Sequence, residues 1–315
     1  MVSISKVINL NPNKNFCRRQ RQNPFLIVLI SLLIFFSSSV FASAFTDDED
    51  QLLNQTASEF KELQIKSQKT QEPNVLKQPV LVGNLNTLGG FAVGVTVVGE
   101  YAYVADHKGG LKIINISSPS LPKFIGDLDT DGLAYGVAIK DDYAYVADKQ
   151  GGLKIINVAT PVSPFQVGHF DTYSAMRVAV VGKYAYVTDS CRGLKIINIS
   201  TPTLPVFAGK LVTDDAYGIA VLGDYAYIAD GIGGFKIIEI IDPTTPRRIG
   251  YLNTESAAQG VAIVDKYAYV ATSKGLEVIN ITNLSEPTRV GKIDLDSGGE
   301  AWDVAAEGDY VYVAG

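Results

Sequence analysis

The stretch that decides the fold is one that the chain repeats. It reads YAYVADHKGGLKIINISSP at residues 101–119 and YAYVADKQGGLKIINVATP at residues 143–161. Aligned on Tyr-x-Tyr, the sequence contains six copies, which begin at Tyr101, Tyr143, Tyr184, Tyr225, Tyr267 and Tyr310. The spacing of 41 to 43 residues matches the length of one propeller blade.

Each copy has the pattern of short β-strands joined by turns. In the second copy, residues 143–146 alternate large and small side chains, and residues 153–158 are rich in β-branched side chains. Residues 148–152 and 160–164 are turn sequences, and residues 165–170 make a further run. We therefore expect an all-β fold, a β-propeller of four-stranded antiparallel blades. A β-solenoid is the alternative, but its coils are usually shorter and form parallel ladders instead of hairpins.

The repeated motifs resemble a known family. Leu-Lys-Ile-Ile-Asn occurs at residues 111–115, 153–157 and 194–198, preceded by Tyr-Ala-Tyr-Val and followed by Ser/Thr-Pro-x-x-Pro. This combination is similar to the LVIVD-repeat family from Pro79 to Gly315. The family name implies Asp at the last motif position, where these copies have Asn, or Glu239 in the fourth copy. The resemblance implies a β-propeller often found outside the cytoplasm, and it carries no established chemistry.

The two ends of the repeat region bear on the number of blades. PVLVGNLNT at residues 79–87 resembles the fourth strand of a blade, as in KFIGDLDT at residues 123–130. Five complete blades follow, and Asp303 to Gly315 supplies only the first two strands of a sixth. We expect a six-bladed ring that lacks one strand, from a truncated sequence, with an exposed edge at the last strand. A ring of seven or more blades is the alternative.

The N-terminal region has the order of features typical of an export signal. Residues 1–23 carry five basic and no acidic side chains, residues 25–36 are apolar except for Ser31, and Ala42-Ser-Ala44 is a small-residue cleavage motif. This order predicts a secretory signal peptide over residues 1–44. Residues 25–45 are uncharged, so an uncleaved membrane anchor is the alternative. Residues 45–77 are predicted to be a polar linker with a weak helix, and residues 78–315 the propeller.

The charge balance limits the partners. After residue 44 the chain has 22 basic and 33 acidic residues, a net charge of −11. Such a surface disfavours nucleic acid and anionic membranes as partners and is compatible with a basic protein or bound cations. We expect the protein to be secreted or held at the cell surface or in the periplasm.

The chemically reactive residues predict no catalytic, cofactor or metal site. His107 and His169 lack the ligands of a zinc site and the partners of a catalytic triad. Cys191 is the one cysteine after residue 44, and we expect an inert loop thiol, with a disulfide to another chain as the alternative. An aspartate recurs at the same strand end before glycine, and it is better explained as a turn acceptor than as a calcium ligand. Its copies are Asp106, Asp148, Asp189 and Asp230.

The copies disagree at one register ahead of each first strand. An alanine identical in all six copies is followed by a variable position and then by glycine, except at Arg177 and Asp303. The variable residues are Val93, Tyr135, Met176, Tyr217, Gln259 and Trp302. Packing between equivalent blades requires the same residue in every copy, so variation of the residue at this position indicates a ligand site. We predict that Tyr135, Met176, Arg177, Tyr217, Gln259, Trp302 and Asp303 bind a ligand on one face of the ring.

The same face should gather acidic residues around these positions. They are Asp129, Asp131, Asp171, Asp214, Asp215, Glu255, Asp294, Asp296 and Glu300. Aromatic rings inside an acidic rim favour a non-catalytic module that binds a protein or a glycan. The alternative is an exported hydrolase or lyase that uses Tyr, Asp and Arg in the central funnel. The lack of a histidine constellation or a cofactor motif favours the binding module.

Overall fold

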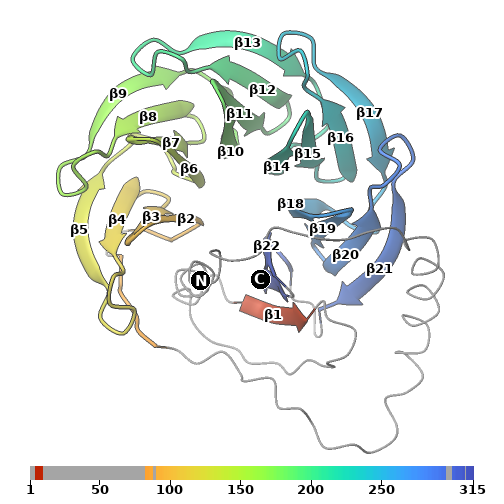
Figure 1. Cartoon of the computed structure of the whole chain (residues 1–315), viewed down its shortest axis with the longest axis horizontal. Helices are drawn as coiled ribbons and strands as arrows, with labels where there is room; N and C mark the ends of the chain where they lie inside the picture. Colours follow the sequence, from red (N-terminus) through yellow and green to blue (C-terminus); the bar gives the residue numbers. More distant parts are fainter. Residues whose placement is uncertain (1–3, 10–81, 88–89, 296–299, 309) are drawn as a thin grey trace, which may run out of the picture.

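The computed structural model describes residues 4–9, 82–87, 90–295, 300–308 and 310–315, and these residues form a ring of β-sheets around a central axis (Figure 1). Five sheets have four antiparallel strands and the sixth has three. The predicted propeller of about six blades is therefore confirmed. No helix among these residues is long and apolar enough to cross a membrane, and the predicted apolar segment at residues 25–36 lies outside them.

Each complete blade is a meander whose strands follow the chain order from the axis outward. Blades one to three contain β2 (Gly94–Val98), β3 (Tyr101–Ala105), β4 (Leu111–Asn115) and β5 (Lys123–Leu128); β6 (Gly136–Lys140), β7 (Tyr143–Ala147), β8 (Leu153–Asn157) and β9 (Phe165–Phe170); and β10 (Ala175–Val181), β11 (Tyr184–Asp189), β12 (Gly193–Asn198) and β13 (Val206–Leu211). Blades four and five contain β14 (Gly218–Leu222), β15 (Tyr225–Ala229), β16 (Phe235–Glu239) and β17 (Arg247–Leu252); and β18 (Ala258–Val264), β19 (Tyr267–Thr272), β20 (Gly275–Asn280) and β21 (Thr288–Asp294). Blade six contains β22 (Asp303–Glu307), β23 (Tyr310–Ala314) and β1 (Ile4–Asn9).

The hydrophobic core lies between neighbouring blades. At the first junction, Tyr103 and Ile113 of blade one pack with Val137, Val146 and Ile156 of blade two. Successive strand residues point to opposite faces, so the middle strands of a blade are apolar on both faces. A single blade cannot bury either face alone, and the stacking of similar blades buries both.

The identical alanine lies where two blades meet on one end of the ring. Ala134, Ala175, Ala216, Ala258 and Ala301 are fully buried. The backbone of Ala134 exchanges two hydrogen bonds of 3.0 Å with His107, in the turn between strands two and three of the preceding blade. A larger side chain would not fit between the two blades, which explains why the residue does not vary.

The outer edge of the sixth blade is paired, although the sequence predicted that it would be open. We expected β23 to lack a neighbour on its outer side, but β1 pairs with it there, and the strand order is β1, β23, β22. Residues 82–87, which we expected to form a fourth strand, lie beside blade one without entering a ladder. Gly83 packs so closely against blade one that a Cβ added there would lie 2.3 Å from the Pro119 carbonyl oxygen.

Candidate functional site

One end of the ring, here called the entry face, carries the loops that lead into the innermost strands and the turns between strands two and three. Backbone bridges hold these loops and turns together, for example Lys149 with Ala175 and Gly231 with Ala258. The residues singled out by the sequence lie at this end, because they follow these alanines directly.

Buried aspartates hold the entry loops in place. Asp106 and Asp148 are fully buried, and their Oδ1 atoms accept hydrogen bonds from Thr87 (2.8 Å) and Thr130 (2.5 Å) in the loops that enter the blades. Asp189 instead accepts backbone N–H bonds from Tyr173 and Ser174. We predicted that these aspartates accept hydrogen bonds within their own turns, but their side chains instead accept them from the entry loops, 15–19 residues away in the chain. Within the described part of the chain, no three or more His, Cys, Asp or Glu side chains are grouped to hold a metal ion.

Two of these carboxylates are incompletely paired. Oδ2 of Asp106 and Oδ2 of Asp148 are buried and accept no hydrogen bond. Burial raises the pKa of Asp148 to about 6, although the hydrogen bond from Thr130 and the charge of Lys154 act in the opposite direction. The carboxyl group of Asp148 therefore changes its charge close to neutral pH.

A row of rings crosses the boundary between blades one and two. The Phe91 ring lies 6.2 Å from the His107 ring, which lies 5.4 Å from the Tyr135 ring. Nζ of Lys149 stands 4.6 Å from the centre of the Tyr135 ring. Burial, together with the charge of Lys149, lowers the pKa of His107. We predicted Tyr135 but took His107 for a simple turn residue and missed Phe91, whose place beside Ala92 was the available signal.

A second group surrounds the turn of blade three. Asp215 accepts a hydrogen bond of 2.7 Å from Ser190 Oγ. Burial and a hydrogen bond with Asp215 raise the pKa of Tyr217 to about 12. The guanidinium of Arg192 lies 4.6 Å from the centre of the exposed Tyr173 ring. Tyr217 was predicted, whereas Tyr173 was not, because it lies two residues before the repeat alanine.

The remaining variable positions differ in exposure. Trp302 is 51% exposed and Gln259 is half-buried, so both are accessible. Met176 is only 8% exposed, and its sulfur accepts a contact of 3.9 Å from Ser174 Oγ. Met176 was expected to stand with the aromatic residues around the axis, but its side chain belongs to the packed interior.

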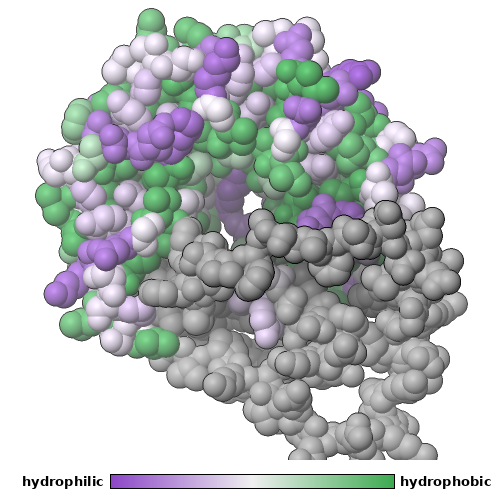
Figure 2. Space-filling model, in the orientation of Figure 1, coloured by the Kyte–Doolittle hydropathy of each residue, from purple (hydrophilic) through white to green (hydrophobic). Residues whose placement is uncertain are grey.

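Arg177 and Asp303 meet across the axis. The strands β10 and β22 that carry them lie on opposite sides of the centre in Figure 1, and Nη2 of Arg177 lies 3.3 Å from Oδ2 of Asp303. Nη1 of Arg177 also donates to the Tyr135 carbonyl oxygen at 2.8 Å. Figure 2 shows an opening near the middle of the ring with hydrophilic residues beside it. Arg177 thus joins the innermost strands from inside, a role that sequence reasoning missed.

The acidic rim is only partly available. Asp129, Asp131 and Asp171 are exposed in the loops that lead into blades two and three. Other members are engaged in ion pairs: Asp214 with Lys236 at 2.5 Å, and Glu255 with Lys292 at 2.7 Å. Asp296 lies outside the described residues. Glu300, ahead of blade six, is exposed as well, so the negative charge open to a partner is spread around the entry face.

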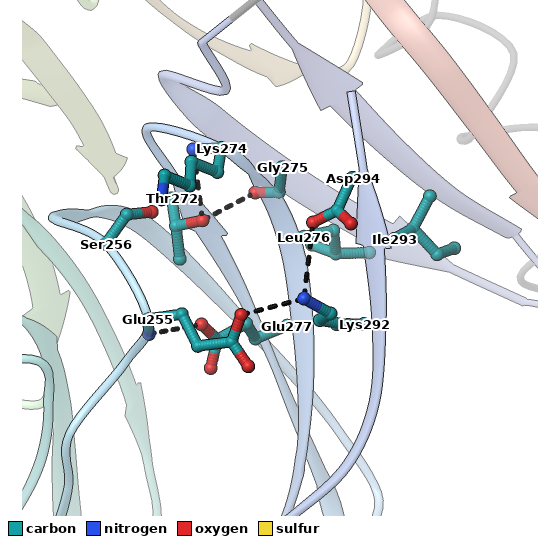
Figure 3. A pocket seen from close by; sticks show the side chains of 10 residues that line it. All are labelled: Glu255, Ser256, Thr272, Lys274, Gly275, Leu276, Glu277, Lys292, Ile293 and Asp294. Carbon is teal, nitrogen blue, oxygen red and sulfur yellow. Dashed lines mark hydrogen bonds and ion pairs between the residues drawn. The ribbon is translucent and has the colours of Figure 1, made fainter. Parts of the chain in front are cut away.

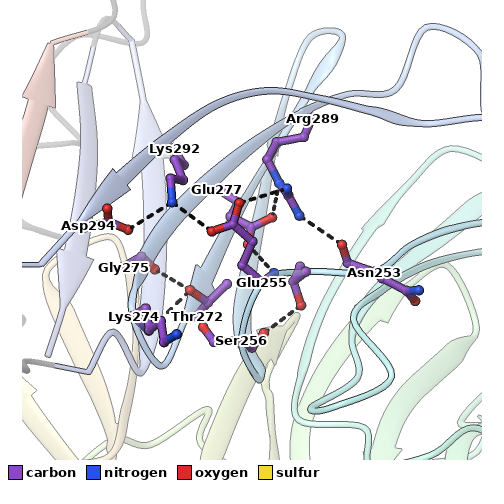
Figure 4. Close-up of polar contacts among 11 residues, drawn as sticks. Asn253, Glu255, Ser256, Thr272, Lys274, Gly275, Glu277, Arg289, Lys292 and Asp294 are labelled. Carbon is purple, nitrogen blue, oxygen red and sulfur yellow. Dashed lines mark hydrogen bonds and ion pairs between the residues drawn. The ribbon is translucent and has the colours of Figure 1, made fainter.

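Blade five carries a charge-reversed version of the repeat (Figure 4). Thr272 replaces the repeat aspartate, and Glu277 replaces the lysine of the third strand. Glu277 is 3% exposed and accepts hydrogen bonds from the Glu255 backbone N–H (2.7 Å) and from Arg289 Nε (2.6 Å). Thr272 and Glu277, with Glu255 and Lys292, line a small pocket with room for about one water molecule (Figure 3).

The fold and the site together define a β-propeller that presents aromatic rings and carboxylates at one end of its ring. A family model described as the LVIVD repeat matches residues 89–130, 131–172, 174–213, 214–254, 256–294 and 298–315, so the chain belongs to the LVIVD-repeat family. The family resemblance predicted from the sequence is confirmed. None of the curated proteins matches the chain in sequence.

Solved structures resemble the chain in fold. A protein from Lactobacillus plantarum aligns with a TM-score of 0.60 at 14% identity, over 68% of this chain and 74% of that one. The β-propeller domain of Cps50 (Swd1) from Myceliophteria thermophila aligns with a TM-score of 0.55 at 10% identity, over 70% and 82% of the two chains. The computationally designed Ika8 protein aligns with a TM-score of 0.54 at 13% identity, over 70% of each chain. At these identities the similarity concerns the fold alone.

Proposed function

We propose that the protein is an exported, non-catalytic interaction module that binds a basic protein segment on its entry face. The observation that carries this proposal is a set of exposed rings beside exposed carboxylates. Phe91 is 67%, Tyr173 is 56% and Trp302 is 51% exposed, and Asp129, Asp131, Asp171 and Glu300 are exposed in the loops of the same face. Aromatic side chains lose little conformational entropy on binding, and carboxylates attract a cationic partner.

The enzyme alternative has less support from the geometry. It requires Arg177 to hold a substrate anion, but the guanidinium donates to the carbonyl oxygen of Tyr135 and lies against the carboxylate of Asp303. Tyr217, which would act as the acid or base, has a pKa raised to about 12, far from neutral pH. Arg177 is therefore better suited to holding the innermost strands together than to catalysis.

Export is proposed from the order of basic, apolar and small residues over residues 1–44. N-terminal sequencing of the exported protein should read Phe45 as the first residue. Recovery of an intact Met1 on a membrane-bound form would support the alternative, in which the segment remains as an anchor.

The binding proposal is tested on the purified full chain with a labelled lysine-rich peptide. Tyr173→Ala and Trp302→Ala should each weaken binding about tenfold or more, which corresponds to about 1.4 kcal/mol. Tyr251→Ala is the matched control, because Tyr251 is 55% exposed but lies on the outer strand β17.

The salt dependence and the choice of ligand complete the test. Affinity for the basic peptide should fall as the salt concentration rises. Equal binding by all three variants would place the contact elsewhere on the ring. Capture of an uncharged oligosaccharide in preference to the peptide, lost in Trp302→Ala, would show that the face binds glycans.

A further inference from the structure

The outer edge of β23 is paired with a strand whose sequence is that of a repeat. Lys6-Val-Ile-Asn9 matches Lys-Ile-Ile-Asn of the third strands in blades one to three. These six residues, Ile4–Asn9, lie more than three hundred positions before β23 (Tyr310–Ala314) along the chain. Ile4–Asn9 therefore resembles the third strand of a blade in sequence, although it does not belong to one of the repeats.

The pairing register supports the same conclusion. Asn9 lies opposite Tyr310, Ile8 opposite Val311 and Val7 opposite Tyr312. In blade one, Asn115, Ile114 and Ile113 lie opposite Tyr101, Ala102 and Tyr103, which are the equivalent positions. A shift of one residue would place every side chain on the wrong face, so agreement over three consecutive pairs is specific.

The pairing also continues past a bulge to the same end point. Lys6 lies opposite Val313 and Ile4 opposite Ala314, with Ser5 left out by a register shift. In blade one, Leu111 lies opposite Ala105 at this place. The bulge lets an aliphatic residue, Ile4, take the register position of the repeat leucine despite the extra residue.

Residues 82–87 lie at the position of the fourth strand of blade six. The position of Gly83 against the Pro119 carbonyl oxygen, at 2.3 Å from an added Cβ, repeats that of Gly126 against Pro161, at 2.2 Å. Thr87 donates to Asp106 as Thr130 donates to Asp148. Strands one and two of blade six thus come from one end of the chain, and the third and fourth positions come from the other.

We infer that the edge of β23 is a binding site for an extended Lys-Val-Ile-Asn strand, and that Ile4–Asn9 is its occupant in the intact chain. Backbone pairing supplies the affinity of such an edge, and alternate side chains supply the specificity. The inference does not depend on the proposed binding to the entry face. It adds a consequence to the proposed export: removal of residues 1–44 would open this edge to another strand.

A disulfide test on the full chain measures the register. In a background with Cys17→Ser and Cys191→Ser, we expect Val7→Cys with Tyr312→Cys to form an intramolecular disulfide under mild oxidation. Val7→Cys with Val311→Cys is the control, because neighbouring residues of a strand point to opposite faces. Equal yields from the two pairs, or no disulfide in either, would overturn the inference.

A peptide test measures the site independently. A labelled peptide of residues 3–12 should bind the full-length Ile8→Pro variant at least tenfold more tightly than the unchanged protein, because proline removes a ladder donor from β1 and frees the edge. Lys14→Pro, outside β1, should behave like the unchanged protein. Equal peptide affinity for Ile8→Pro and Lys14→Pro would contradict the inference. If Ile8→Pro does not fold, the disulfide yields alone decide.

Discussion

Arg177 and Asp303 occupy positions that are glycine in the other copies, and close packing explains the glycines. A Cβ on Gly218 would lie 2.7 Å from the Gln259 carbonyl oxygen, and one on Gly94 would lie 2.8 Å from that of Tyr135. The two charged residues instead extend into the central space, where each meets the other. Two exceptions to the repeat thus compensate for each other across the axis.

The first prediction separates the two partners of this contact. Arg177→Ala should lower the free energy of unfolding by about 1–3 kcal/mol, because it removes hydrogen bonds from a charged donor to backbone carbonyls. Asp303→Asn should cost less than about 1 kcal/mol, because the ion pair is partly exposed to solvent. Urea unfolding measures both changes. Exposed Arg192 provides the control variant, Arg192→Ala, and a larger loss for Asp303→Asn than for Arg177→Ala would contradict the assignment.

The second prediction concerns pH. Burial raises the pKa of Asp148 from 3.8 to about 6, so the folded protein binds this proton more tightly than the unfolded chain. The contribution to stability is full below about pH 4 and is lost as the pH rises through about 6. Thermal unfolding should therefore show that the unchanged protein loses stability relative to Asp148→Asn as the pH rises from 4 to 7, so that its free energy of unfolding minus that of the variant decreases. A stability of the unchanged protein that rose relative to Asp148→Asn with increasing pH would refute the buried protonated carboxyl.

Blade five shows how one element of a repeat changes its charges and keeps its packing. The aspartate and the lysine of the other blades lie close together, as Asp230 and Lys236 do in blade four. In blade five both have changed, to Thr272 and Glu277, and Arg289 supplies the positive charge from the fourth strand. The pocket beside Thr272 lies at the strand end where the other blades have the aspartate.

The third prediction is a double-mutant cycle in this blade. Thr272→Asp should destabilise the protein because it adds a carboxylate next to buried Glu277, and Glu277→Lys should do so because it leaves Arg289 facing a like charge. The double variant, which restores the residues of the other blades, should be more stable than the sum of the single changes predicts, by about 0.5–3 kcal/mol. Chemical denaturation of the four proteins measures the coupling. Additive changes would mean that the two sites do not communicate.

The ring as a whole depends on the alanine shared by all blades, because each copy lies at a junction and a wider junction would change the angle between blades. The fourth prediction is that Ala134→Leu and Ala258→Leu each lower the free energy of unfolding by about 1–3 kcal/mol through overpacking. Ala305→Leu, at an exposed position in β22, should change it by less than about 0.5 kcal/mol. Similar losses at all three sites would mean that the junctions do not limit the ring.

The architecture could be predicted from the sequence because the information is local and repeated. A period near one blade, two-residue alternation in Tyr-Ala-Tyr-Val and turn residues at constant offsets each specify the same blade, and every junction reuses the same contacts. The identical alanine and the buried aspartates could be placed for the same reason. Tyr135, Tyr217 and Trp302 could be predicted as candidate site residues because the copies of the repeat differ at their position.

Contacts between distant residues could not be predicted in this way. The pairing of Arg177 with Asp303 joins positions 126 residues apart, and the repeat alone does not say which side chains meet across the axis. The burial of Met176 and the row of Phe91, His107 and Tyr135 depend on how loops from adjacent blades lie together. The pairing of β1 with β23 depends on the edge that ring closure leaves, since a short Lys-Val-Ile-Asn segment has no partner until the sixth blade is in place.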